Sequence, residues 1–123
     1  MISRYAAPGG ATYSDAVLVE AGGARWIYAA GQTPREPAPA DLEGQAEACF
    51  RQLAEVLGAH GAGLGDVVQI TVYLTSLKDY QAFAAVRGRV FGTETPASAA
   101  VGVASLLGDA LIEISAVAAV ERP

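Results

Sequence analysis

The sequence has few basic residues, and this scarcity excludes one class of partner. Eight lysines and arginines stand against thirteen aspartates and glutamates, which gives a formal net charge of −5. A protein that binds nucleic acid through its phosphates, or that binds an anionic membrane surface, needs a basic face. Because no cluster of basic residues occurs in the chain, we expect neither a nucleic-acid partner nor a membrane partner.

Cysteine and histidine are equally scarce, with one residue of each. Cys49 has no second cysteine to pair with, and it falls on the apolar stripe of a predicted helix, where we expect it to pack as an inert side chain. His60 falls where the same helix ends, so a Ser–His catalytic pair is not expected. The chain also lacks Cys-X-X-Cys, His-Glu-X-X-His and glycine-rich phosphate-loop motifs, and we predict no metal and no cofactor.

No stretch of the chain predicts a membrane span or a secretion signal. Residues 97–120 are long and apolar, but Asp109 and Glu113 lie among them, and an aspartate at the centre of a spanning helix costs about 2.5–3.5 kcal/mol. The first ten residues contain no apolar core of signal-peptide length. A length of 123 residues suits one domain. We therefore expect a single cytoplasmic domain over residues 1–123.

The spacing of the apolar residues predicts a mixed α+β fold. Residues 42–57 and 76–91 carry apolar side chains at helical spacing, and Asp41 is the expected N-cap of the first helix. Gly22 and Gly23 predict a tight hairpin. Strand character is found over residues 2–5, 15–21, 25–31, 67–74, 97–105 and 110–120. The order is then roughly β-β-β-α-β-α-β-β in two layers, and the last two strands flank Leu-Leu-Gly-Asp as a second expected hairpin.

One face of the predicted sheet carries few charges. It offers Gln69, Thr71, Tyr73, Glu113 and Ser115 and, on one parity of the fifth strand, Ser98, Ala100 and Gly102. A sheet face in contact with water normally carries lysine, glutamate and arginine. This face instead suits close contact with another protein surface. We therefore predict an oligomer in which Glu113 lies near a boundary between subunits.

Glu113 is an unusual residue for its segment. It stands within Ala-Leu-Ile-Glu-Ile-Ser, residues 110–115, which has the character of a buried strand. Removing a lone carboxylate from water costs several kcal/mol, roughly, unless it is paired, hydrogen-bonded or protonated. Glu113 therefore either points to water or has a specific environment, which is structural, as an acceptor at a subunit contact, or functional, as a general acid or base.

Four segments covering nearly the whole chain carry a resemblance to a known family. They are YSDAVLV (13–19), IYAAGQTP (27–34), VVQITVYLTSLKDY (67–80) and TPASAAVGVASLLGDALIEISAVA (95–118). They resemble the Rid proteins, also called YjgF/YER057c/UK114. Pro96-Ala97 and Ile112-Glu113-Ile114 match family motifs at the right separation. The resemblance implies a chorismate-mutase-like two-layer domain, assembled as a homotrimer around a central barrel with three inter-subunit clefts.

The resemblance also implies an activity. The best-known Rid proteins are enamine/imine deaminases, which hydrolyse compounds such as 2-aminoacrylate to a 2-oxo acid and ammonia without a cofactor. It implies that Glu113 positions or activates water and that Tyr13 and Gly31 line the cleft. The family arginine that clamps the substrate carboxylate is replaced by Ser98, and a cysteine that often follows is replaced by Ala100. The chain is thus similar to the arginine-less branches.

Residues on the second helix complete the predicted site. Ala84 aligns with an asparagine that many members carry, and Arg87 lies at the edge of the apolar stripe. Arg87 and Arg35 are the candidate substitutes for the missing cation. We predict Glu113 and Tyr13 as catalytic residues. The predicted substrate-binding residues are Gly31, Ser98, Ala100, Ala84 and Arg87, and we expect Glu113 and Ser98 to come from one subunit and Ala84 and Arg87 from its neighbour.

Two classes of function stay open on this evidence. The first is a Rid-type hydrolase or tautomerase acting on an enamine, imine or related tautomerisable metabolite, with Glu113 as acid/base and with little activity on 2-aminoacrylate because position 98 is serine. The second is a non-catalytic metabolite-binding or scaffold trimer. A nuclease activity, which the family's older naming suggests, is disfavoured by the acidic charge and the missing basic groove.

Overall fold

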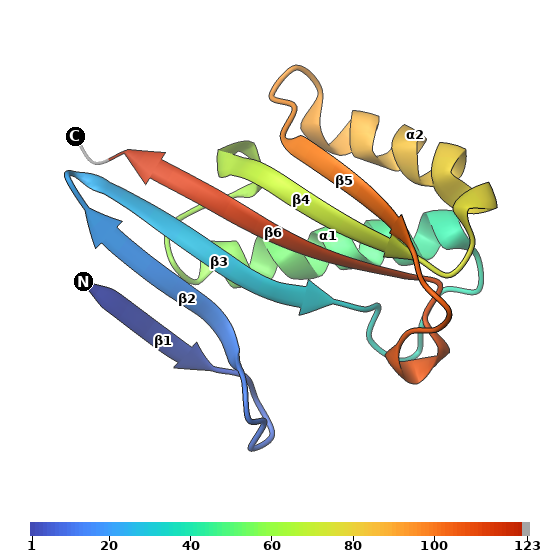
Figure 1. Ribbon diagram of the computed structural model, residues 1–123, viewed down its shortest axis with the longest axis horizontal. Helices are drawn as coiled ribbons and strands as arrows, with labels where there is room; N and C mark the ends of the chain where they lie inside the picture. The colour runs from blue at the N-terminus through green and yellow to red at the C-terminus, as the bar shows by residue number, and fades with distance from the viewer. Residues whose placement is uncertain (122–123) are drawn as a thin grey trace.

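The computed structural model describes residues 1–121 as one six-stranded sheet with two helices on one of its faces (Figure 1). The strands are β1 (Ile2–Ala6), β2 (Ser14–Ala21), β3 (Ala24–Gln32), β4 (Val67–Leu74), β5 (Ala97–Gly102) and β6 (Ile112–Glu121). The helices are α1 (Leu42–Gly58) and α2 (Tyr80–Phe91). The predicted α+β class and the order of the elements are confirmed, with boundaries that differ by a few residues.

The sheet has the strand order β1-β2-β3-β6-β4-β5, so the predicted hairpin between the last two strands is wrong. Helix α2 carries the chain from the end of β4 back to its start, and β5 therefore runs parallel to β4 at the edge of the sheet. The chain then crosses β4, and β6 inserts between β3 and β4, antiparallel to both. β6 takes a central place because its inward side chains are fully aliphatic. The Leu-Leu-Gly-Asp segment forms a 3-10 turn within this longer connection.

The hydrophobic core lies between the sheet and the two helices. The predicted apolar stripe of α1 is buried in full, and its residues are Leu42, Ala46, Cys49, Phe50, Leu53, Val56 and Leu57. Asp41 caps α1 as predicted, since its Oδ1 accepts a 3.0 Å hydrogen bond from the Gly44 amide. Phe50 joins the two helices, with ring centroids 6.3 Å from Phe83 and 5.5 Å from Phe91. These contacts hold α2 against α1 and thereby place α2 over the edge strand β5.

The hairpin between β2 and β3 is confirmed. Gly22 and Gly23 both have positive φ angles, 58° and 79°, which glycine adopts at little cost and which two-residue turns of this kind require. The turn sets the register of β2 on β3, and β3 in turn pairs with β6. The register of β2 on β3 therefore follows from one short turn.

The two faces of the sheet differ as the alternation predicted, with one correction. Thr71 is paired with Ser115, and Tyr73 with Glu113, so these side chains share the open face. β5 has the opposite parity from the one expected. Ser98, Ala100 and Gly102 pair with Ile70, Val72 and Leu74, whose side chains are buried under the helices, and so they lie on the helix side.

The long apolar stretch over residues 97–120 forms two strands and their connection. Within residues 1–121, neither helix has the length and apolarity that a membrane span requires.

Candidate functional site

Glu113 lies half-buried on the open face of β6, and Gly31 of β3 is in contact with it. The β3–β6 ladder is irregular between Ala29 and Gln32, which displaces Gly31 from regular pairing. A methyl group added at Gly31 would stand 3.0 Å from Cδ of Glu113 and would overlap its Oε2. The missing side chain of Gly31 is therefore what leaves room for the carboxylate.

The Glu113 carboxylate has no partner among the described residues. No hydrogen bond or ion pair within residues 1–121 reaches its oxygens. Because Glu113 is half-buried on the open face, its carboxylate is accessible to water in the isolated chain.

The buried Cys49 lies under the same part of the sheet. Burial, followed by the negative charge of Glu113, raises the pKa of the Cys49 thiol to about 12. The thiol donates to the carbonyl oxygen of Gln32 at 3.2 Å. Cys49 is therefore protonated at neutral pH and packs as the inert side chain that the sequence predicted.

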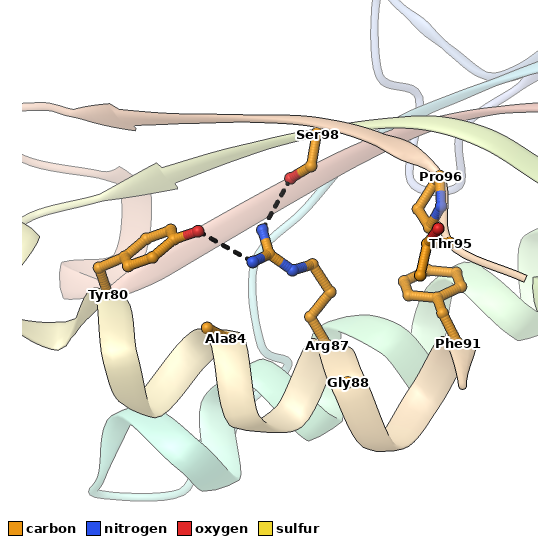
Figure 2. A pocket seen from close by; sticks show the side chains of 8 residues that line it. All are labelled: Tyr80, Ala84, Arg87, Gly88, Phe91, Thr95, Pro96 and Ser98. Atoms are coloured by element: carbon orange, nitrogen blue, oxygen red, sulfur yellow. Dashed lines mark hydrogen bonds between the residues drawn. The ribbon is translucent and has the colours of Figure 1, made fainter. Parts of the chain in front are cut away.

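A groove of about 450 Å³ lies on the other side of the sheet, between α2 and β5. Figure 2 shows its lining, which comes from one face of α2 and from the start of β5. The lining residues are Tyr80, Ala84, Arg87, Gly88, Phe91, Thr95, Pro96 and Ser98. Ala84 and Gly88, the two small residues of the helix wall, leave the open space between helix and strand.

Arg87 occupies this groove with its guanidinium between helix and strand (Figure 2). Its Nη1 donates to Ser98 Oγ at 3.0 Å, and its Nη2 donates to the Tyr80 hydroxyl at 2.9 Å. Its Cζ lies 5.1 Å from the ring centroid of Phe83 and 5.5 Å from that of Tyr80, within the range of cation–π attraction. The side chain that the sequence identified as a candidate substitute cation is thus held directly beside Ser98.

This arrangement corrects the predicted grouping of the site. Ser98, Ala84 and Arg87 meet within one chain, whereas the sequence argument divided them between neighbouring subunits. Glu113 and Gly31 lie on the open face, which is the opposite side of the sheet from Ser98. One chain therefore carries two separate groups of candidate residues, called here the acid half-site (Glu113 and Gly31) and the guanidinium half-site (the groove of Arg87).

Three further predicted residues lie outside both half-sites. Tyr13 precedes β2 with 61% of its surface exposed, and no hydrogen bond joins its phenol to Glu113 within the described chain. Ala100 shares the side of Ser98 on β5 but does not line the groove. Arg35 forms a 2.9 Å ion pair with Glu55 on the exposed surface of α1. Arg35 is thus engaged elsewhere, which leaves Arg87 as the better placed of the two candidate cations.

Sequence reasoning missed Tyr80 as a site residue. Tyr80 was counted only as part of the apolar stripe of α2, although its hydroxyl bonds Arg87. The signal was present in the spacing, because residues seven apart lie two turns apart on the same helix face. Phe91 and Thr95 were missed as well, and their role depends on how the edge strand passes the helix, which the sequence does not display.

The described residues offer no obvious metal centre. No group of three or more histidine, cysteine, aspartate or glutamate side chains lies close enough to hold a metal ion within residues 1–121.

Comparison with known proteins gives a consistent result. The sequence model of the family described as endoribonuclease L-PSP matches residues 4–120. A RutC family protein of Pyrococcus abyssi is 36% identical over 111 residues, which cover 86% of this chain and 84% of that protein. The 2-iminobutanoate/2-iminopropanoate deaminase of Homo sapiens is 35% identical over 124 residues, covering 96% of this chain and 88% of the human protein.

Solved structures agree with the sequence comparisons. The crystal structure of RidA from an Antarctic Psychrobacter species superposes with a TM-score of 0.79 and 32% identity, covering 95% of this chain and 94% of that chain. The similarity extends over the whole fold, and so it includes the elements that carry both half-sites.

Proposed function

The chain belongs to the Rid family, and we propose that it is a small-molecule enzyme acting on an enamine, an imine or a related tautomerisable metabolite. The observation that carries the proposal is Glu113, a half-buried carboxylate that no donor or cation of the described chain engages. A carboxylate between Ile112 and Ile114, in contact with a glycine, is well placed to transfer protons to and from a small ligand. The similarity to a human imine deaminase supports this class of reaction.

Glu113 acts in both halves of the proposed hydrolysis. It accepts a proton from water as the water oxygen bonds to the imine carbon, and it passes that proton to the imine nitrogen. The resulting carbinolamine gives its hydroxyl proton to Glu113, which transfers it to the amino group. The C–N bond then breaks, ammonia leaves and a carbonyl compound remains. Tautomerisation of an enamine would use the same carboxyl group to move a proton between carbon and nitrogen.

The serine at position 98 argues against 2-aminoacrylate as the main substrate. The clamp arginine of the best-known members has no counterpart on β5, since Ser98 is short and uncharged. Charge-assisted hydrogen bonds contribute roughly 1.5–3 kcal/mol each, so binding of a small 2-imino-carboxylate at that point is expected to weaken by an order of magnitude or more. We propose that the substrate is a larger or differently anchored compound.

The proposed site is completed by a second copy of the chain. Glu113 and Arg87 lie on opposite sides of one sheet, so a single compact ligand reaches both only if they come from different copies. The open face has a hollow of about 180 Å³ lined by Tyr28, Gln69, Thr71 and Ser115 with neighbouring residues, and Tyr28 is 47% exposed. We propose a homotrimer that covers this face. The cytoplasmic location stays a prediction.

The test of the function is turnover with matched acid variants. Imines would be generated in situ from a panel of amino acids by an amino-acid oxidase, from larger amines without an α-carboxylate by a flavin-dependent amine oxidase, and 2-aminoacrylate from serine by a pyridoxal-phosphate dehydratase. We expect the wild type to accelerate hydrolysis of some larger imines, and 2-aminoacrylate little. Glu113→Gln should abolish the acceleration, whereas Glu94→Gln, which removes the same charge from an exposed position, should leave it intact.

Two results would contradict the proposal. A Glu113→Gln variant with wild-type rates would show that this carboxylate is not the acid/base. Tight binding of metabolites without turnover of any imine would instead favour the second candidate, a non-catalytic metabolite-binding or scaffold trimer. The substitution at position 98 is the observation that favours that alternative.

A further inference from the structure

We propose that the groove between α2 and β5 is a carboxylate-binding subsite centred on Arg87, and that the ligand is an organic acid with a short apolar chain. The inference rests on the proposed function in that it names the substrate class of the same site. The binding itself depends only on the groove, and it can be measured without any turnover.

The hydrogen-bond inventory of the groove is the first reason. The Ser98 and Tyr80 hydroxyls each accept one bond from the guanidinium. Each hydroxyl keeps its own hydrogen to donate, and the guanidinium, which has five N–H groups, keeps three. Donors from a strand and a helix therefore surround one guanidinium. A ligand group that accepts several hydrogen bonds and carries negative charge satisfies them best.

The charge balance of the groove is the second reason. No acidic residue lines it, and within residues 1–121 no carboxylate forms an ion pair with Arg87. Arg89, two positions along the same helix, is by contrast paired with Glu43 at 2.8 Å and with Glu47 at 3.3 Å. Arg87 is thus available to a ligand, whereas the charge of Arg89 is neutralised by Glu43 and Glu47.

The guanidinium is also held in place before any ligand arrives. Its plane is supported by the Tyr80 and Phe83 rings, and both ends are fixed by the two hydroxyls. A cation that is already oriented loses little side-chain freedom on binding. A single guanidinium with neutral hydroxyl neighbours matches one planar carboxylate, whereas a phosphate dianion would call for further positive charge.

The remaining walls describe the rest of the ligand. Phe91, Pro96 and Ala84 are apolar, and Gly88 adds no side chain. The guanidinium lies at Ser98 Oγ, near the strand itself, whereas an arginine at position 98 would hold its charge at the far end of its own side chain. A carboxylate bound by Arg87 therefore lies closer to β5 than one bound at the end of an arginine side chain at position 98. An acid whose carbonyl or imine carbon is separated from the carboxylate by further carbon atoms fits this position better than 2-aminoacrylate does.

Calorimetric titration with matched ligands tests the inference. The probes are 4-oxopentanoate, its neutral amide 4-oxopentanamide, pyruvate and inorganic phosphate. We expect the wild type to bind 4-oxopentanoate about tenfold or more tightly than the amide, and more tightly than pyruvate or phosphate. Arg87→Gln should weaken the binding of 4-oxopentanoate by a similar factor, and Arg87→Lys should retain part of the affinity. Arg51→Gln, which removes the same charge from an exposed site on α1, should change nothing.

The outcomes separate this inference from the proposed hydrolysis. Each titration is repeated in the Glu113→Gln background, where binding of 4-oxopentanoate should persist while imine hydrolysis is lost. Equal binding of the acid and the amide by the wild type would overturn the inference, and so would an Arg87→Gln variant with wild-type affinity. Tighter binding of phosphate would identify a phosphate site instead, and equal binding of pyruvate would overturn the argument from the position of the carboxylate. If Arg87→Gln does not fold, the comparison of acid with amide on the wild type decides.

Discussion

The Cα of Gly31 faces the carboxylate of Glu113 so closely that a methyl group there would stand 3.0 Å from Cδ. The contact joins β3 to β6 at the point where their ladder is irregular. It also gives the glycine a steric role that is independent of its backbone freedom, because its φ angle is not in the left-handed region.

Gly31→Ala should therefore damage both stability and activity. The added methyl group must push the Glu113 side chain aside or shift the strand, and overpacking of this kind costs about 1–3 kcal/mol. Urea denaturation would measure the loss, and imine hydrolysis would fall with the displaced carboxylate. Gly58→Ala is the matched control, since a Cβ there meets nothing within 4 Å and alanine is favoured in a helix. A Gly31→Ala protein as stable and active as the control would contradict the steric role.

Gln45 should prove important for the position of β6. Its buried side chain accepts a 2.8 Å hydrogen bond from the Leu111 amide and donates a 2.9 Å bond to the Pro39 carbonyl. Gln45→Leu would leave both backbone groups without a partner, at a cost of about 1–3 kcal/mol each if they stay dry. We expect a clear fall in the urea midpoint, compared with almost none for Gln81→Leu on the exposed side of α2. Equal midpoints for the two variants would show that Gln45 does not tie the loops together.

The Cys49 thiol should make stability depend on pH in the alkaline range. Its pKa in the folded state is about 12 against an ordinary value of 9.0, so the fold favours the protonated form. This stabilisation is complete below about pH 9 and is lost as the pH rises from there toward 12. The difference in unfolding free energy between wild type and Cys49→Ala should shrink by about 1 kcal/mol per pH unit in that range.

Denaturation curves at about pH 8 and pH 10 would measure that difference, and the Cys49→Ala variant serves as the baseline for every other titrating group. The same pKa predicts that the native thiol reacts slowly with thiol reagents until the protein unfolds. A wild type and variant whose stabilities change in parallel with pH would contradict the shift.

The proposed homotrimer can be tested by a substitution on the open face of the sheet. Light scattering of the wild type should give three times the 12.5 kDa of one chain. Thr71→Arg places a charge beside the hollow of that face, where a second copy would have to bury it, and should produce the single-chain mass. Ala59→Arg, at the exposed end of α1, should leave the assembly unchanged. A wild type that scatters as one chain would refute the trimer.

Much of the fold follows from local patterns in the sequence. The stripe of α1, the Asp41 cap and the Gly22–Gly23 turn depend on neighbouring residues, and each was predicted. The position of β5 was not predicted. Whether two strands that follow each other in the sequence form a hairpin or are separated by a third strand depends on which strand takes the centre of the sheet, and this is decided by long-range contacts. That error also reversed the face assigned to Ser98.

The candidate site was predicted as a set of residues but not as an arrangement. Glu113 stood out because a carboxylate is rare in an apolar strand, and Arg87 because it borders an apolar stripe. Glu113 and Arg87 lie on two sides of the sheet because α2 covers the face opposite Glu113, and the parity of β5, which the sequence did not determine, places Ser98 on the side of Arg87. The bond from Arg87 to Ser98 joins a helix to a strand eleven residues away, a distance that no local pattern encodes.

The neighbourhood of Arg87 and Ser98 bears on how relatives of this chain are classified. A comparison that examines only the position after Pro96-Ala97 finds serine and concludes that the positive group has been lost. Yet a guanidinium is present within 3.0 Å of that serine, delivered from a helix instead of a strand. In this chain the positive charge beside residue 98 therefore comes from α2, although residue 98 itself is neutral. Grouping such proteins by the side chain that lies beside residue 98 would separate those that lack a cation there from those that supply it from another element.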